Sequence, residues 1–311
     1  SIRRQRQMCI RDRTKGELIM KISQIIKTVI AGTLISTSTI TFSLYHSEKA
    51  KAEVDHYYRD GFQYPTYVTA LNKAKKISNK KLSISHYTTT KQSKLKAIGR
   101  VSNKNGWKKG SNDPKVRKQD SMGTGTVIGS HTFITNAHVI DDRYGKAAAA
   151  KYISFDMNRD GKSIPYHFHA SKVIKVPQSD IAVVHTKENM GKYVKPIRIA
   201  TDKEIKSLKF NSTLYSLGYP WQHNDNTKAY FNRLRFVQFS GNGSEILTKD
   251  IFRSGASGSP MLDSKFSKIY GLRTYGYNLD GKSTDQYAKQ EMAGGESFKG
   301  SAGQFVRKNI K

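Results

Sequence analysis

Two segments of the sequence place a histidine and an aspartate beside strand-like runs. His138 lies in the run at residues 133–140, and Asp180 stands immediately before the β-branched run at residues 181–184. A lone histidine in such a place is more often structural, and an aspartate often closes a turn. A carboxylate at the mouth of a buried strand needs a partner, however, because burying it unpaired is costly. The two residues are therefore candidates for a base and its orienting carboxylate.

A third segment surrounds a serine with small residues. Residues 254–260 read Ser-Gly-Ala-Ser-Gly-Ser-Pro, and a sharp turn there would expose the central Ser257. The backbone N–H groups of Gly255 and Ser257 can then point at one position, as in an oxyanion hole. Gly-Ser stretches are often plain loops, so this segment alone only suggests a site. Nucleophilic attack on an amide requires a hydroxyl, a base, a carboxylate and oxyanion donors, which the three segments together supply.

The elements that position these residues are predicted to be β-strands. From Gly123 onward, short β-rich runs alternate with Gly, Asn and Asp turns, a spacing typical of an all-β barrel protein. Because no crossover helices separate the runs, a parallel α/β sheet is not expected. Residues 53–119 are polar and rich in Lys, with one weak helical stretch at 67–81, and are interpreted as a propeptide or an N-terminal arm. The expected strands are 126–128, 132–135, 152–155, 181–185, 213–217, 233–239 and 269–273.

The N-terminal residues are predicted to be an export signal. Met20 begins a basic region, residues 28–44 form an apolar core, and small residues at 50–52 place the cleavage before Glu53. A retained membrane anchor is the alternative, although the core is short and rich in hydroxyl groups. Residues 1–19 do not fit upstream of such a signal and resemble a translated sequencing adapter, so we treat them as non-biological. We therefore expect residues 20–52 to be a signal peptide and the protein to be secreted, from a Gram-positive bacterium.

Charge and cysteine content narrow the remaining possibilities. The chain has 54 basic and 24 acidic residues, a formal net charge of +30, spread along its length. Such a surface attracts polyanions, which could be cell-wall or host-surface polymers, although a solvated basic surface without a specific ligand is more common. Charge alone indicates no specific nucleic acid. The only cysteine, Cys9, precedes the predicted signal, so the exported chain is expected to lack disulfides.

The three segments resemble those of trypsin-like serine proteases, most closely the staphylococcal glutamyl endopeptidases and exfoliative toxins. The resemblance implies two six-stranded antiparallel β-barrels of the chymotrypsin type, at residues 120–200 and 201–311. It also implies a monomer that cleaves proteins or peptides without a metal or cofactor. By this resemblance His138 is general base and then acid, Asp180 orients it, and Ser257 is the nucleophile. The motifs that carry the resemblance are 123–129, 135–138, 180–184, 217–220 and 255–260.

The resemblance weakens at the predicted specificity pocket. Glutamyl endopeptidases carry a histidine that holds the acidic side chain of the substrate, where this chain has Arg273 followed by Thr274. Arg273 could pair with a carboxylate if it points into the pocket. Phe252 replaces a hydroxyl residue of the relatives and would narrow the pocket or make it apolar. A preference for Glu or Asp before the scissile bond is therefore left open.

Two other function classes were weighed. One is a protease-fold protein that has become a catalytically silent binding protein for anionic surfaces, although an intact triad favours an enzyme. The other is an α/β-hydrolase, which requires the chain order Ser, acid, His rather than the order found here. The remaining histidines, among them His167, His169 and His185, do not form a convincing metal-ligand set.

Overall fold

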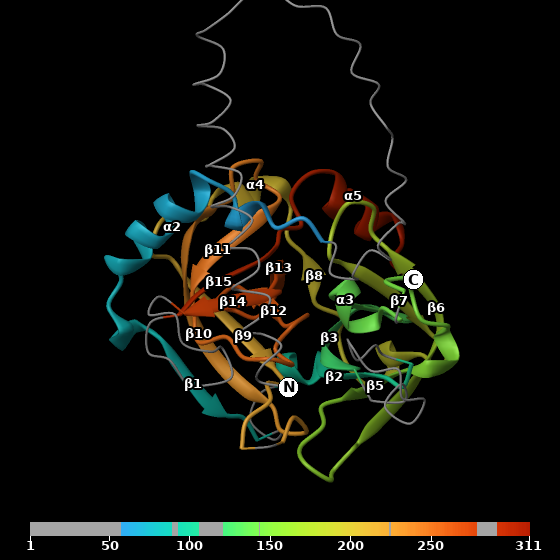
Figure 1. Ribbon diagram of the computed structural model, residues 1–311. Helices are drawn as coiled ribbons and strands as arrows, with labels where there is room; N and C mark the ends of the chain where they lie inside the picture. Colours follow the sequence, from blue (N-terminus) through green and yellow to red (C-terminus); the bar gives the residue numbers. More distant parts are fainter. Residues whose placement is uncertain (1–56, 89–92, 106–120, 143, 224, 279–290) are drawn as a thin grey trace, which may run out of the picture. The chain divides into compact units, whose positions relative to one another are not determined.

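The computed structural model describes residues 57–88, 93–105, 121–142, 144–223, 225–278 and 291–311 (Figure 1). All of them belong to one compact unit, Val54–Lys311. The predicted adapter-like segment at 1–19 and the predicted signal peptide at 20–52 lie outside the described residues. Within the described part of the chain, no helix combines the length and apolarity needed to cross a membrane.

The first half of this unit is a closed barrel of six antiparallel strands. Its core is aromatic: the rings of Phe133 and Phe155 stack with centroids 4.6 Å apart, and a Cβ on Gly125 would press against both side chains. Around the barrel the strands are β2 (Ile98–Asn103), β3 (Ser121–Gly129), β4 (Thr132–Thr135), β7 (Ala182–Thr186), β6 (Tyr166–Lys175) and β5 (Ile153–Met157).

The first barrel begins with strand β2 at Ile98 rather than at the expected residue 120. It pairs with β3 on one side and β5 on the other, so the barrel would have two open strand edges without it. All six residues of β2 are buried, although the region around them is polar in sequence. The stretch interpreted as a propeptide or arm thus contributes to the barrel core.

The second half is a nine-stranded sheet that is only partly closed. An isolated bridge between Gly271 and Ser297 connects strand β13 to the residue after β15. The predicted all-β class is confirmed, and the expected second barrel is seen only in part, because the sheet has nine strands and β8 and β13 pair in parallel. The path of the sheet is β14 (Tyr275–Asn278), β15 (Glu291–Glu296), β11 (Glu245–Lys249), β10 (Tyr230–Phe239), β9 (Thr213–Gly218), β12 (Pro260–Leu262), β13 (Lys268–Leu272) and β8 (Arg198–Ile199), with β1 (Ser83–His86) on β10.

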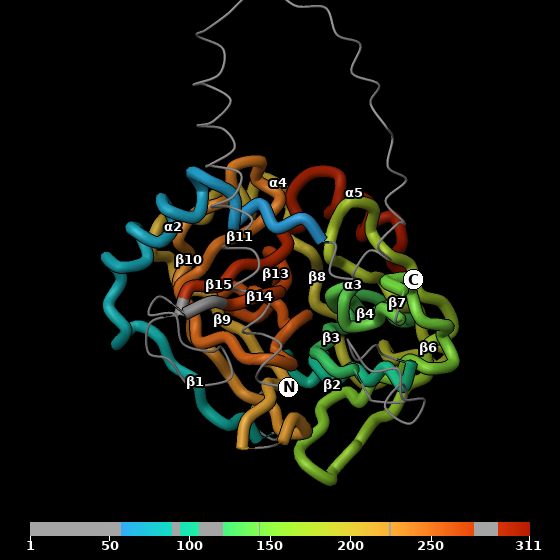
Figure 2. The backbone as a smooth tube through the Cα atoms, viewed as in Figure 1, coloured from blue at the N-terminus to red at the C-terminus, as the bar shows by residue number. Residues whose placement is uncertain are grey.

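Over the described residues the helices are few and short, as the tube in Figure 2 shows. The α-helices are α2 (Thr66–Lys75), α3 (Ala137–Ile140), α4 (Asp202–Lys206) and α5 (Ser301–Lys308). The 3-10 turns are η1 (Asp60–Phe62), η2 (Asn79–Lys81), η3 (Ser93–Ala97), η5 (Ala150–Tyr152) and η6 (Met190–Lys192). The helical stretch expected at 67–81 is α2 followed by η2, and its small face at Ala70 and Ala74 packs on Val237 and Leu247 of the second half.

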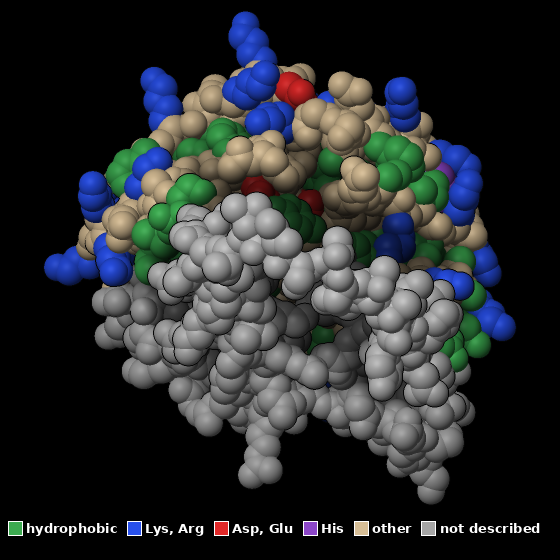
Figure 3. Space-filling model, turned by 45° about the horizontal axis from the view of Figure 1, so that its top comes forward, with side chains coloured by type: hydrophobic (Ala, Val, Ile, Leu, Met, Phe, Trp, Pro, Cys, Tyr) green, Lys and Arg blue, Asp and Glu red, His purple; other side chains and the backbone are tan. Residues whose placement is uncertain are grey.

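Basic side chains are dispersed over the surface, as the sequence indicates. On the face drawn in Figure 3, Lys and Arg side chains lie at many separate places over the described residues, and acidic side chains are few. The described part of this face therefore carries more basic than acidic side chains.

Candidate active site

His138 is held by Asp180 through two hydrogen bonds. It lies in the single turn α3, directly after strand β4, and its backbone N–H donates to Asp180 Oδ1 at 2.8 Å. Its ring nitrogen Nδ1 lies 2.7 Å from Asp180 Oδ2. Because an ionised carboxylate only accepts hydrogen bonds, Nδ1 carries the proton and Nε2 of the neutral ring is left as an acceptor. This is the tautomer that a general base requires.

Asp180 is completely buried immediately before strand β7. Burial by itself raises the pKa of this carboxyl group, but the charges of His138 and Arg59 and the hydrogen bonds from His138 lower the pKa to about 2. Its backbone carbonyl accepts from Asn136 Nδ2 at 2.6 Å and from the Ala137 N–H at 3.2 Å. The carboxylate is thus ionised at neutral pH and fixed at both its side chain and its backbone.

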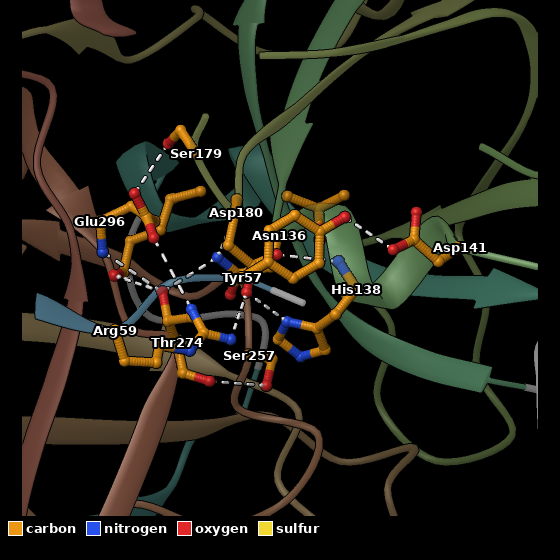
Figure 4. Close-up of polar contacts among 12 residues, drawn as sticks. Tyr57, Arg59, Asn136, His138, Asp141, Ser179, Asp180, Ser257, Thr274 and Glu296 are labelled. Carbon is orange, nitrogen blue, oxygen red and sulfur yellow. Dashed lines mark hydrogen bonds and ion pairs between the residues drawn. The ribbon is translucent and has the colours of Figure 1, made fainter. Parts of the chain in front are cut away.

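Ser257 lies on a loop of the second half whose conformation depends on glycine. Gly255 and Gly258 have φ angles of +87° and +85°, and a Cβ on Gly258 would overlap with the carbonyl oxygen of Thr124. Figure 4 shows the His138 ring between Asp180 and the Ser257 side chain. Ser257 Oγ donates to the Thr274 carbonyl at 3.3 Å, and no hydrogen bond to His138 Nε2 is present among the described residues. For Ser257 to act as a nucleophile its hydroxyl would have to turn toward His138, and hydrogen bonds of a catalytic pair often tighten only when substrate binds.

The predicted oxyanion donors are available on this loop. Among the described residues, the amides of Gly255 and Ser257 donate no hydrogen bond within the protein. The carbonyl of Ser254, which belongs to the same peptide unit as the Gly255 amide, accepts from the Trp221 N–H at 2.6 Å, and this bond holds that peptide unit in place. Donors that are held in place by the loop and unoccupied can bind an oxyanion without rearrangement.

Thr124 of strand β3 connects the first barrel to the serine loop, a role that its place in the sequence does not reveal. Its backbone N–H donates to the Ser257 carbonyl at 2.8 Å, and its hydroxyl donates to the Gly255 carbonyl at 3.1 Å. The same hydroxyl oxygen accepts from the Tyr219 N–H at 2.9 Å. These bonds join the half that carries His138 to the half that carries Ser257.

Replacing Thr124 with Val is expected to lower kcat by roughly tenfold or more, since a misplaced reacting group costs about that much. The variant keeps the side-chain shape but leaves the buried Gly255 carbonyl and Tyr219 amide without their partner. Thr126→Val is the matched control, because the Thr126 hydroxyl is buried on the same strand with no hydrogen-bond partner in the described part of the chain. Peptide hydrolysis rates of both variants test this. Equal rates for the two would contradict a role of the Thr124 hydroxyl.

The residues expected in the specificity pocket lie beside the serine loop, but Arg273 is not open to substrate. Arg273 is buried, and its Nε donates to Asp250 Oδ2 at 2.6 Å. Its guanidinium also lies over the ring of Phe252, 5.3 Å from the centroid, and Phe252 packs on Ala256. The side chain of Thr274 accepts from Asn136 Nδ2 at 2.9 Å. The carboxylate that pairs with Arg273 in this structure is thus the internal one of Asp250.

Two charged residues near the triad were not found from the sequence. Arg59 Nη2 lies 2.7 Å from Asp180 Oδ2, and Arg59 Nη1 lies 3.6 Å from Glu296 Oε1. Glu296 is buried and accepts from Ser179 Oγ at 2.7 Å. Burial and the neighbouring charge of Asp180 raise the pKa of Glu296 to about 7. No local pattern marks these residues, because 121 positions of sequence separate Arg59 from Asp180.

The raised pKa of Glu296 predicts a specific pH dependence of stability. The folded state binds the Glu296 proton more tightly than the unfolded state, so this contribution is complete below pH 4.5 and is lost as the pH rises through 7. The loss amounts to about 3 kcal/mol. Glu296→Gln mimics the protonated form, and we expect its free energy of unfolding to gain relative to the unsubstituted protein between pH 4.5 and 8. Urea unfolding measures this difference, and a difference that does not change with pH would contradict the assignment.

Comparisons with known proteins concern the domain type and the fold. The sequence model of the trypsin-like peptidase domain matches residues 123–272, which include all three predicted catalytic residues. Among solved structures, a Glu endopeptidase aligns with a TM-score of 0.53 and 19% identity over 73% of this chain and 95% of its own. The protease Anisep from Arthrobacter nicotinovorans aligns with a TM-score of 0.52 and 14% identity over 71% of this chain and 96% of its own. A thermostable serine protease AL20 from an extremophilic microorganism gives 0.51 and 15%, over 70% and 98%. Residues 123–272 are thus similar to a trypsin-like peptidase domain, and the solved structures share the fold of this chain.

Proposed function

We propose that the protein is a serine endopeptidase that uses Ser257, His138 and Asp180. The observation that carries the proposal is the His138–Asp180 pair. A buried, ionised carboxylate fixes both the position and the tautomer of the ring, and the ring lies beside a serine on a glycine-shaped loop (Figure 4). A histidine with a purely structural role does not need a buried carboxylate that fixes its tautomer and leaves Nε2 as an acceptor.

The geometry supports acyl transfer in two steps. His138 Nε2 takes the proton of Ser257 Oγ while the oxygen attacks the carbonyl carbon of the scissile bond, and the oxyanion binds the Gly255 and Ser257 amides. His138 then gives the proton to the leaving amine, and the acyl group stays on Ser257. Water, deprotonated by His138, hydrolyses the acyl-enzyme and regenerates the hydroxyl. Asp180 stays ionised throughout and stabilises the imidazolium.

We further propose that the residue before the scissile bond is small or uncharged. The similar structure of a Glu endopeptidase favours an acidic residue, but the Arg273 guanidinium already binds Asp250 and lies against Phe252. A Cβ on Gly276 would overlap with Phe252, so this ring fills the space beside Gly276. Cleavage of a mixed peptide library tests the preference. Cuts that follow mainly Glu or Asp would refute this proposal and restore the acidic preference.

A catalytically silent binding protein is the second candidate, and one observation favours it. The Ser257 hydroxyl is bonded to the Thr274 carbonyl rather than to His138, and the basic surface suits anionic polymers (Figure 3). The peptidase is the preferred candidate because both His138 contacts with Asp180 are formed.

For either candidate function we propose an extracellular site of action, in keeping with the predicted export signal.

Covalent labelling distinguishes the two candidates. A fluorophosphonate probe reacts only with an activated serine hydroxyl, so we expect one label on Ser257, located by mass spectrometry of the digested protein. Ser257→Ala should remove the label. Ser259→Ala, which changes a serine two positions away whose hydroxyl bonds the Ala256 carbonyl, should keep it. A folded, unlabelled chain would support the silent binding protein.

A further inference from the structure

Residues 57–61 form a strap that contacts both halves of the protein. Figure 2 shows this stretch, at the blue end of the described chain, beginning between the two halves. On the first half, the Tyr57 hydroxyl donates to Asp141 Oδ2 at 2.6 Å. On the second half, the Gly61 N–H donates to Glu245 Oε2 at 2.7 Å, and Asp60 Oδ2 accepts from the Asn242 N–H at 2.7 Å. These long-range hydrogen bonds hold the short strap in its position on the two halves.

Arg59 directs its side chain from the strap to the back of the predicted triad (Figure 4). Its guanidinium shares Asp180 Oδ2 with His138, each nitrogen lying 2.7 Å from that oxygen. It also lies 5.2 Å from the centroid of the Tyr275 ring, which packs against it from the second half. The Arg59 side chain is 15% exposed, so most of it is removed from water.

The carboxylates that surround the Arg59 guanidinium require a compensating positive charge. Asp180 and Glu296 are both buried and repel one another, and Glu245 lies nearby on strand β11. Buried carboxylates without a compensating charge take up protons or move apart. On the first-half side, Asp141 faces Tyr57 and Lys175, so its charge is compensated separately. In the described residues, Arg59 is the cation within ion-pair distance of both Asp180 and Glu296.

We propose that Arg59 is a positioning residue of the triad, and that the strap at residues 57–61 is therefore a retained part of the active enzyme. The inference rests on the proposed function and deepens it. Arg59 holds the ionised Asp180 carboxylate aimed at His138 Nδ1, and the strap holds the half with His138 against the half with Ser257. Any maturation cut that leaves a fully active enzyme must then lie before Tyr57.

The test compares substitutions of Arg59 with a substitution of Arg159, an arginine of similar burial. Arg59→Ala removes the cation, Arg59→Lys keeps a charge without the planar fork, and Arg159→Ala is the matched control. Arg159 makes an equivalent 2.7 Å pair with buried Asp156 and is 17% exposed, but the pair lies outside the triad. We expect kcat/KM to fall by roughly 10- to 100-fold in Arg59→Ala, by less in Arg59→Lys, and by under about threefold in Arg159→Ala. Should Arg59→Ala not fold, Arg59→Gln retains more volume and replaces it.

A second readout does not depend on catalysis. Removing a positive charge beside Asp180 makes protonation of His138 easier, so the midpoint of its ring-proton NMR titration should move to higher pH. The acid limb of kcat/KM should move in the same direction, and Arg159→Ala should move neither. A loss of folding stability alone would not shift this midpoint. The shift without fluorophosphonate labelling of the unsubstituted chain would support the role of Arg59 and overturn the peptidase.

Three results would contradict the inference about Arg59 and the strap. Labelling of Ser257 together with an unchanged titration and unchanged kcat/KM in Arg59→Ala would overturn the inference while the peptidase stands. Higher activity in Arg59→Ala would also overturn it, because the strap would then restrain the triad rather than position it. A chain beginning at residue 63 that keeps full activity would show that the strap is dispensable.

Discussion

Replacing His138 with Ala is expected to lower kcat by about six orders of magnitude, the scale seen when a serine protease loses its general base. The proposed nucleophile Ser257 then has no base to remove its proton, although the loop that holds it and the Gly255 amide are unchanged. Residual hydrolysis would come from binding and the oxyanion donors alone. Peptide hydrolysis followed over hours, together with fluorophosphonate labelling, measures the loss.

The control for this prediction is His167→Ala. His167 Nδ1 lies 2.6 Å from Asp156 Oδ1, so it reproduces the histidine–aspartate pair in the same barrel without a neighbouring serine of the candidate site. We expect its kcat to stay within about threefold of the unsubstituted protein, since a surface substitution away from the site has small effects. A similar loss in both variants, or no loss in His138→Ala, would remove His138 from the mechanism.

Replacing Asp180 with Asn is expected to lower kcat by about 10⁴-fold, the cost of the wrong histidine tautomer in serine proteases. The amide nitrogen of the new side chain can donate to Nδ1, which favours a proton on Nε2. His138 could then no longer accept the proton of Ser257. The substitution also removes the 2.7 Å ion pair between Arg59 and residue 180, because an amide carries no charge.

The effect of Asp180→Asn on tautomer is separable from an effect on folding. Unfolding by urea reports stability, and NMR of the His138 ring nitrogens reports which one carries the proton. Asp156→Asn changes an aspartate that pairs with His167 and Arg159 in the same barrel, and it should leave kcat nearly unchanged. A folded Asp180→Asn protein with its proton still on Nδ1 and normal kcat would contradict the assigned role.

Local sequence patterns were enough to predict the fold class and the candidate catalytic residues. The turn-separated β-rich runs after Gly123 predicted an all-β protein, and every expected strand overlaps an observed one. The small residues around Ser257 predicted a sharp loop, which the positive φ angles of Gly255 and Gly258 realise. Such features follow from steric preferences of neighbouring residues, and these are written in short stretches of sequence.

Strand β2 and the pocket residues show where local patterns were insufficient. Residues 98–103 gave no strand signal against their polar surroundings, and they form a strand because β3 and β5 both need a partner. The sequence position of Arg273 was compatible with a side chain that faces the substrate. In the folded chain its Nε instead donates to Asp250 Oδ2, 2.6 Å away. Both outcomes depend on which segments the topology makes neighbours.

The sequence by itself determined the chemistry that is available: a hydroxyl, an imidazole and a carboxylate, each beside a strand. Only the tertiary structure decided which charges surround them. Arg59 reaches Asp180 across 121 positions, and Glu296 reaches Ser179 across 117, through contacts that exist only after both halves have folded. The physical reason is that a buried charge is stabilised by whatever lies within a few ångströms of it, and long-range packing rather than neighbouring sequence sets that environment.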